Sequence, residues 1–259
     1  MNTTHIRIRF TWLLLSICFL LASYSAGATL FQVSTLQALV SGIYDGEMPL
    51  KQLLTHGNFG IGTFNGLNGE MVILNGTVYQ ITATGSVEKP ELSVMVPFAA
   101  ITAFESTNRI TLSDTITINA LCLRLDSCLR SKNLFYAVKI TGEFDSLTTR
   151  SIPQQEKPYS PMKDVIHYQS VFSLNAKTGT IVGFRCPDYA QGVNMPGYHL
   201  HFIAADTLSG GHVLKGSVHN AVVEWQELSS FTMALPGDSC FLHANLKAQD
   251  EATIKKIEK

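Results

Sequence analysis

The segment "GYHLHFIAADTLSGGH", residues 197–212, decides how the C-terminal part of the chain folds. Apolar, β-favouring residues flank the turn-rich "DTLSGG", so we expect two antiparallel strands joined by a short turn. Side chains alternate between the two faces of a strand, which puts His199 and His201 on one face, about 6.6 Å apart. The returning strand brings His212 directly or diagonally opposite them. The hairpin therefore gathers three imidazoles on one face.

Three imidazoles at this spacing favour a metal site with an open fourth position. Zinc is the usual metal for neutral imidazole ligands, at about 2.0–2.1 Å, and copper, nickel or iron also fit the residue types. Structural zinc normally has four protein ligands, so three histidines favour catalysis. No Cys-x-x-Cys pair offers thiolate ligands instead. For the histidines that stand alone we expect hydrogen-bonded core or rim positions: His56, His167, His219 and His243.

Outside this hairpin the chain consists mostly of short β-favouring runs. Asn75-Gly76 between two such runs is the strongest hairpin signal. Helical patterns occupy 36–55, with Ser34 as the cap, and 116–130. We expect strands over 59–64, 69–85, 94–104, 134–144, 165–174, 179–187, 211–228 and 229–236.

The proline-rich segment 152–162, "IPQQEKPYSPM", is expected to be irregular or extended and to mark a seam. It separates an N-terminal sheet-and-helix portion, 29–151, from a C-terminal β portion, 152–259, which carries the metal hairpin and a returning tail. The sequence thus predicts an α+β fold with mixed or antiparallel β-sheets in two packed α/β portions and a few helices.

Residues 1–28 have the three parts of a secretory signal peptide. Arg7 and Arg9 form a basic start, 12–21 is an apolar run, and Ala26-Gly27-Ala28 is a small-residue cleavage site. No other stretch is apolar for long enough to cross a bilayer. We expect a protein exported to the periplasm or beyond, with no membrane partner after cleavage near Ala28.

Charge and cysteine content limit the partners further. Without the two leader arginines, 19 − 2 = 17 basic residues face 20 acidic ones, a formal charge of −3. This weak, scattered charge predicts no nucleic-acid partner and favours a small-molecule ligand. Cys122 and Cys128 lie six residues apart on an expected helix, about 9 Å, which is beyond disulfide reach. Whether Cys186 and Cys240 pair stays open.

Three segments, in order, resemble the bacterial alpha-acetolactate decarboxylase family. They are the hairpin "GYHLHF…SGGHVL", the N-terminal "GNFGIGTFNGLNGEMVILNG" and the central "TTRSIPQQEKPYSP". The similarity runs through nearly all of the chain after the leader. The resemblance implies zinc-dependent conversion of 2-acetolactate to acetoin and carbon dioxide, in two packed α/β portions and, in many members, a homodimer.

The resemblance also assigns site residues. The family's three zinc ligands match His199, His201 and His212. The family's active-site glutamate matches Glu70, and the threonine that precedes it matches Thr63. The family's arginine matches Arg150. The family brings a glutamate from the C-terminal tail to the site. This residue matches Glu258 best, and Glu251 is the alternative.

These residue types suit the chemistry. Loss of carbon dioxide leaves an electron pair that the neighbouring ketone accepts as an enediolate, so the site must stabilise an oxyanion. The guanidinium of Arg150 can hold the carboxylate or the oxyanion, and either Glu70 or Glu258 can protonate the carbon.

Two other functions fit the histidines alone. One is a zinc-hydroxide enzyme, either a hydrolase or a carbonic-anhydrase-like catalyst, because such a site also acidifies bound water. The other is an exported, non-catalytic metal-binding protein with a closed site. The motifs around Glu70 and Arg150 argue against both, since a metal buffer has little use for a positioned arginine.

Overall fold

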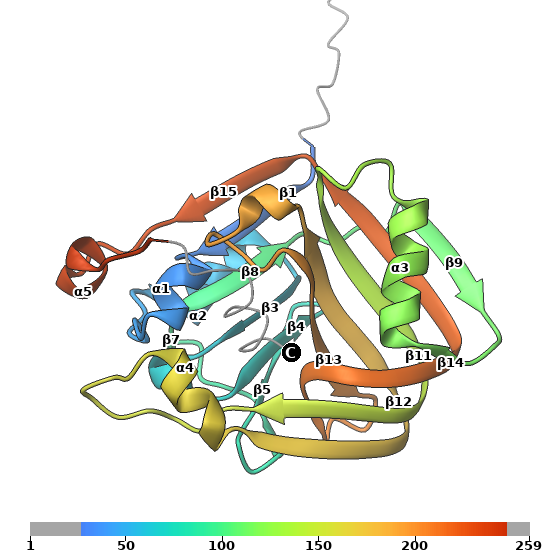
Figure 1. Ribbon diagram of the computed structural model, residues 1–259, viewed down its shortest axis with the longest axis horizontal. Helices are drawn as coiled ribbons and strands as arrows, with labels where there is room; N and C mark the ends of the chain where they lie inside the picture. Colours follow the sequence, from blue (N-terminus) through green and yellow to red (C-terminus); the bar gives the residue numbers. More distant parts are fainter. Residues whose placement is uncertain (1–26, 248–259) are drawn as a thin grey trace, which may run out of the picture.

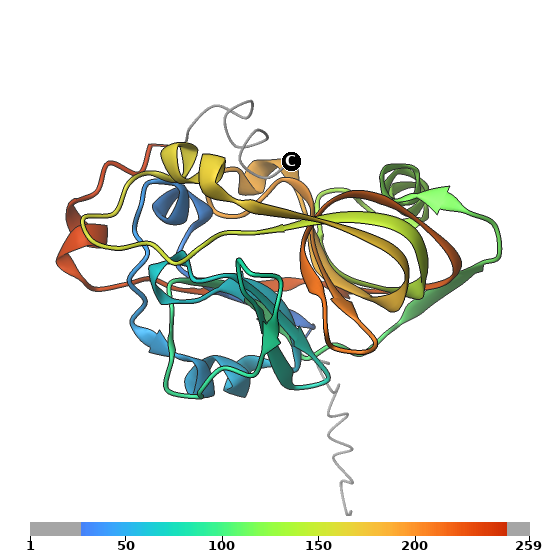
Figure 2. The same ribbon diagram turned by 90° about the horizontal axis from the view of Figure 1, so that it is seen from below.

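Two β-sheets pack against each other and short helices cover their margins, as the computed structural model shows in two views (Figures 1 and 2). The structure describes residues 27–247. Mixed, largely antiparallel sheet with few helices confirms the predicted fold class. Whether the chain divides into two units at 151/152 stays a prediction.

The N-terminal sheet has seven strands. Its only parallel pair among the described residues joins β1 and β15, which brings a C-terminal strand back beside the first one. In spatial order the strands are β15 (Ser230–Ala234), β1 (Thr29–Val33), β8 (Phe98–Thr102), β3 (Phe59–Thr63), β4 (Glu70–Leu74), β5 (Thr77–Ile81) and β6 (Val87–Glu88).

The second sheet contains long, bent strands that close into a ring. β11 pairs with β12, β12 with β13, β13 with β14, and β14 with β11 again. Three register shifts between β11 and β14 supply the bends. Two short strands extend β14 on its outer edge. The bounds are β9 (Asn108–Leu112), β10 (Ile116–Thr117), β11 (Phe135–Ser151), β12 (Ser170–Cys186), β13 (Gly197–Ala204) and β14 (Gly210–Leu228).

Apolar side chains fill the ring and the space between the sheets. Inside the ring, Phe144 and Phe202 meet edge to face, and helix α3 (Ile118–Cys128) closes this core with Leu121 and Leu125. The core between the sheets contains side chains of both, among them Ile61, Val72, Val182, Phe184 and Ile203.

The remaining elements are short. Helix α1 and helix α4 pack together over one end of the N-terminal sheet. The bounds are α1 (Leu36–Val40), α2 (Leu50–Leu53), α4 (Met162–Val165), α5 (Ser239–His243), β2 (Met48–Pro49) and β7 (Met95–Val96), with 3-10 turns at Leu54–His56, Asn65–Leu67, Ile166–Tyr168 and Asp188–Ala190. In the described part of the chain, no helix has the length and apolar character needed to span a bilayer.

One local prediction is confirmed, and one question that the sequence analysis left open is answered. Asn75 and Gly76 both have positive φ, 52° and 77°, and connect β4 to β5 as a two-residue hairpin turn. No disulfide joins any of the described cysteines, so Cys186 and Cys240 do not pair.

Two local predictions are wrong. Helix α1 is capped by Thr35, whose side chain accepts a hydrogen bond from the backbone N–H of Ala38, and not by Ser34. The expected strand 165–174 begins as helix α4 and a 3-10 turn, and strand β12 starts only at Ser170. Met162 and Val165 are buried against helix α1, so tertiary packing outweighs the β preference of this run.

Candidate metal centre

Strand pairing brings the predicted metal ligands together. His201 of β13 is paired with His212 of β14, and His212 is paired with Arg150 of β11. Paired residues on neighbouring strands share a face of the sheet, so these three side chains lie in one row. His199, two residues before His201, shares that face. The predicted antiparallel hairpin is therefore confirmed.

The imidazole nitrogens lie at metal-ligand spacing. His201 Nε2 is 3.2 Å from His199 Nε2 and 3.3 Å from His212 Nδ1. One nitrogen from each ring lies within 4.8 Å of the other two. Ligands about 2.0–2.1 Å from a tetrahedral ion are about 3.3–3.4 Å apart, so this triad fits a divalent metal.

A backbone carbonyl of the other sheet sets the tautomer of His201. Its Nδ1 lies 2.9 Å from the carbonyl oxygen of Met71 in β4. A carbonyl oxygen only accepts, so Nδ1 carries the hydrogen and the lone pair of Nε2 faces the other two histidines. Orientation of a ligating histidine through its second nitrogen is the usual arrangement at metal sites.

Burial keeps His199 and His201 neutral. The three rings are between 1% and 7% exposed. Burial, followed by the charge of Arg150, lowers the pKa of His199 to about 3. Burial also holds the pKa of His201 well below its usual value, with His199 and Arg150 adding to the effect. Only neutral imidazole can ligate a metal, so the fold provides His199 and His201 in the form that a metal ion requires.

Glu70 enters the same space from the N-terminal sheet. Its Oε2 is 3.5 Å from His201 Nε2, and the residue is 8% exposed. Thr63 pairs with Glu70 across β3 and β4, and its hydroxyl donates a 2.7 Å hydrogen bond to the carbonyl oxygen of Gly69. Gly69 has φ +79°, and a Cβ there would overlap the carbonyl oxygen of Ile81. The turn into Glu70 thus requires glycine.

Hydrogen bonds between the two sheets flank Glu70. The N–H of Gly69 donates to the carbonyl oxygen of Ile152 at 3.1 Å. The buried hydroxyl of Ser151 donates to the carbonyl oxygen of Ile81 at 2.7 Å. Ile81 is paired with Glu70, and Ser151 follows Arg150 in the chain. Together with the His201 contact, these bonds hold β4 against the strands of the ring.

All six predicted site residues in the described part of the chain line one cavity of about 30 Å³. They are Thr63, Glu70, Arg150, His199, His201 and His212. The cavity has room for about one water molecule. Apolar side chains complete its walls: Leu39, Leu67, Phe98, Ile152 and Met162. Charges in such a small space, shielded by protein from bulk solvent, interact more strongly than they do in water.

Comparison with known proteins identifies the family. The family model for alpha-acetolactate decarboxylase matches residues 30–248. The chain belongs to the alpha-acetolactate decarboxylase family. It is 44% identical to the alpha-acetolactate decarboxylase of Methanosarcina mazei, over 92% of this chain and 82% of that protein. It is 42% identical to that of Methylococcus capsulatus, over 88% of each chain.

A solved member of the family has the same fold. The crystal structure of alpha-acetolactate decarboxylase from Bacillus subtilis superposes with a TM-score of 0.87, at 36% identity, over 89% of this chain and 99% of that one. The fold and the family resemblance expected from the three motifs are confirmed.

The structure brings together Thr63, Glu70, Arg150 and the three histidines, and their roles stay predictions. Glu258 and its alternative Glu251 lie outside the described residues. No sequence pattern pointed to two further contributors, Ser151 and the carbonyl oxygen of Met71. Any residue offers a backbone carbonyl, so only the packing of the sheets reveals that contact.

Proposed function

We propose that the protein converts 2-acetolactate to acetoin and carbon dioxide at a zinc ion held by His199, His201 and His212. One observation carries the proposal. In this chain, which belongs to the alpha-acetolactate decarboxylase family, the three imidazoles line one cavity with the buried side chains of Arg150 and Glu70. The donor set and its spacing fit zinc. When bound, zinc supplies a positive charge that stabilises the oxyanion formed as carbon dioxide leaves.

Arg150 binds the acid group in this proposal. It is 3% exposed and lies beside His212 in the row of paired residues. A guanidinium keeps its charge when buried and holds a carboxylate through two parallel hydrogen bonds. This orients the scissile bond before carbon dioxide leaves.

Glu70 moves the proton. Once carbon dioxide has left, the electron pair lies between the carbinol carbon and the former ketone, and that carbon must accept a proton to give acetoin. Glu70 is anchored by its strand pairing with Thr63 and Ile81, so it reaches the carbon from one side only. One enantiomer of acetoin is the expected product. Glu258 is the alternative donor.

Several coarser expectations accompany the activity. We propose that residues 1–28 direct export and are removed near Ala28, that the partner is a small molecule and not nucleic acid or membrane, and that the protein forms a homodimer. Sizing of the secreted protein and N-terminal sequencing test these points.

The decisive experiment measures acetoin and carbon dioxide formed from racemic 2-acetolactate. The protein is assayed as isolated, after chelation and after zinc return, beside His201→Ala. His219→Ala is the matched control, because His219 also lies on β14 but its ring nitrogens lie near the carboxylates of Glu143 and Asp145, at 3.4 and 2.9 Å, instead. Zinc-dependent turnover that His201→Ala loses and His219→Ala keeps is the expected result. A folded, zinc-loaded protein without turnover contradicts the proposal and makes the zinc-hydroxide hydrolase the function to test.

A further inference from the structure

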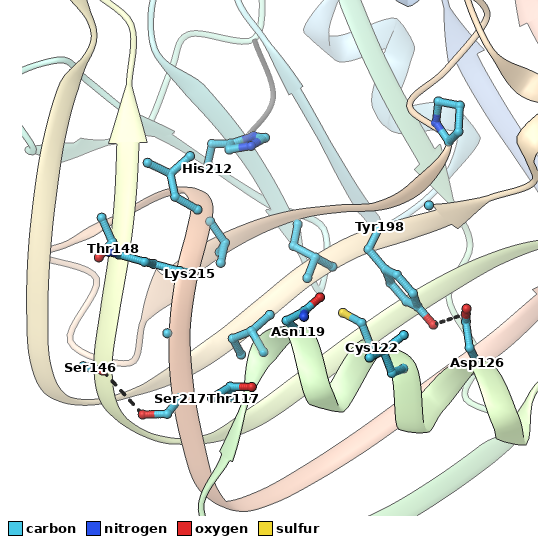
Figure 3. A pocket seen from close by; sticks show the side chains of 18 residues that line it. Thr117, Asn119, Cys122, Asp126, Ser146, Thr148, Tyr198, His212, Lys215 and Ser217 are labelled. Atoms are coloured by element: carbon cyan, nitrogen blue, oxygen red, sulfur yellow. Dashed lines mark hydrogen bonds between the residues drawn. The ribbon is translucent and has the colours of Figure 1, made fainter. Parts of the chain in front are cut away.

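A second, larger cavity lies under helix α3. Its volume is about 780 Å³, compared with about 30 Å³ at the metal centre. This is within the range of about 300–1,000 Å³ found for small-molecule sites. Figure 3 shows it between helix α3 on one side and strands β11, β13 and β14 on the other. The proposed reaction does not use it.

The floor of this cavity is the reverse face of the metal-binding strands. Tyr198, Leu200 and Val213 line it, and each is the chain neighbour of a metal-site histidine. Neighbouring side chains on a strand point to opposite faces. His212 borders both cavities and lies at the margin of the large one in Figure 3.

One end of the cavity suits an anion. Lys215 is paired with Thr148 across β14 and β11, and Ser217 is paired with Ser146, their hydroxyl oxygens 3.4 Å apart. Lys215 is exposed and forms no ion pair with any residue between 27 and 247. Its ammonium and the neighbouring hydroxyls are all hydrogen-bond donors available to a carboxylate.

Within residues 27–247, one acid lines the cavity, and its charge is already balanced by two cations. The carboxylate of Asp126, at the other end, lies 3.0 Å from Lys132 Nζ and 3.4 Å from Arg185 Nε, and it accepts a 2.9 Å hydrogen bond from Tyr198. The wall between the two ends includes the apolar side chains of Leu200 and Leu123, with the amide of Asn119 as a polar exception. The cavity therefore combines one anion-binding end with a mostly apolar middle.

We infer that this cavity is a second ligand site, which takes a small monocarboxylate with an aliphatic chain. The carboxylate binds Lys215 and accepts from the hydroxyls of Thr148 and Ser217, and the chain lies along Leu200 and Val213. Leu200 and Val213 are the chain neighbours of the metal-site histidines. A ligand that favours one spacing between β13 and β14 therefore also shifts the histidines and changes the affinity of the metal centre for zinc.

The test uses Cys122, a partly buried thiol that lines the cavity. In the full chain, Cys18, Cys128 and Cys240 are replaced by serine so that they do not react. Cys186 is kept, because it is fully buried and the reagent does not reach it. Alkylation of Cys122 by iodoacetamide is followed by mass spectrometry with octanoate or 1-octanol present. At an octanoate concentration of four times its Kd, the rate should fall about fivefold, because only the free fraction reacts.

Octanoate should bind about threefold more tightly than 1-octanol, the size expected for an exposed ion pair. Lys215→Met should abolish this difference, and Lys51→Met, at an exposed lysine on helix α2, should keep it. No protection of Cys122 by octanoate overturns the site. Equal protection by the acid and the alcohol, or an unaltered difference in Lys215→Met, overturns the carboxylate assignment.

Coupling to the metal centre is measured as zinc affinity, by chelator competition with and without octanoate. We expect a change of about fivefold in the unsubstituted protein, at the low end of common coupling factors. An unchanged zinc affinity overturns the coupling. None of these measurements contains acetolactate, so they succeed or fail independently of the proposed decarboxylation.

Discussion

Strands β13 and β14 have two faces with opposite character. One carries three buried histidines around a cavity of about 30 Å³, with hydrogen bonds from the neighbouring sheet on either side. The other opens into about 780 Å³, with an exposed lysine and the 64% exposed Leu123 at its margin. Period-two alternation thus lets one hairpin combine a small, buried polar centre on one face with a large, open cavity on the other.

The largest contrast should come from replacing neighbouring residues on opposite faces. His201→Ala removes a proposed zinc ligand, so zinc content should be lost and kcat/KM for acetolactate should fall about 10³-fold or more. Leu200→Ala, one residue away, should instead lower the free energy of unfolding by about 2–4 kcal/mol while the protein keeps its zinc. Metal analysis, kinetics and urea unfolding separate the two effects. Equal zinc content in both variants would contradict the assignment of faces.

Acid should destabilise the metal face through its neutral histidines. The pKa of His199 is about 3 in the folded protein against 6.5 for an unperturbed histidine, so below pH 6.5 the unfolded chain binds a proton that the folded one does not. The stabilisation is complete above pH 6.5 and is lost as pH falls toward 3. At pH 5 the metal-free protein should lose about 2 kcal/mol through His199 alone.

Urea unfolding of the chelated protein between pH 8 and pH 5 measures this loss. His199→Asn has no imidazole to protonate, so its stability should fall less steeply over that range. If the variant and the parent protein lose stability in parallel, the histidine is not the cause.

Two buried arginines offer the next contrast. Arg150 is 3% exposed on the metal face, and Arg185 is 4% exposed beside Asp126 on the helix face. Arg150→Lys keeps the charge but loses the fork, so kcat/KM should fall about 10- to 100-fold with zinc retained. Arg185→Lys should leave kcat/KM within about twofold of the parent value, because Arg185 contacts Asp126 of helix α3 and not the metal centre. Similar kinetic losses in both variants would remove the distinction between the faces.

The part of the metal centre that lies within one hairpin was predictable from the sequence. His199, His201 and His212 lie within one hairpin, so alternation and a turn suffice to gather them. Glu70 and Arg150 are 80 residues apart on different sheets, and only the family resemblance connected them with the histidines. Sheet pairing over such distances depends on bulges and packing that no local pattern reveals.

On the other face of β13 and β14, the helix was predicted over 116–130, but the cavity beneath it was not. The closing of β11 to β14 into a ring needs three register shifts, and the space under helix α3 follows from that curvature. The same holds for the segment around Val165, where burial against helix α1 replaced an expected strand. Tertiary geometry, not residue preference, decides these features.

The smallest effects should distinguish two serines of strand β11. Ser151 is fully buried and donates to the carbonyl oxygen of Ile81 beside the metal centre, whereas Ser146 is exposed at the large cavity, near Ser217. Ser151→Ala leaves a buried carbonyl without its donor and should lower the free energy of unfolding by about 1–3 kcal/mol. Ser146→Ala should change it by less than about 0.5 kcal/mol, since water replaces the lost partner. Denaturant unfolding of both variants measures the difference. Equal destabilisation would contradict the prediction. It would mean that the buried hydrogen bond of Ser151 stabilises the protein no more than the exposed contact of Ser146.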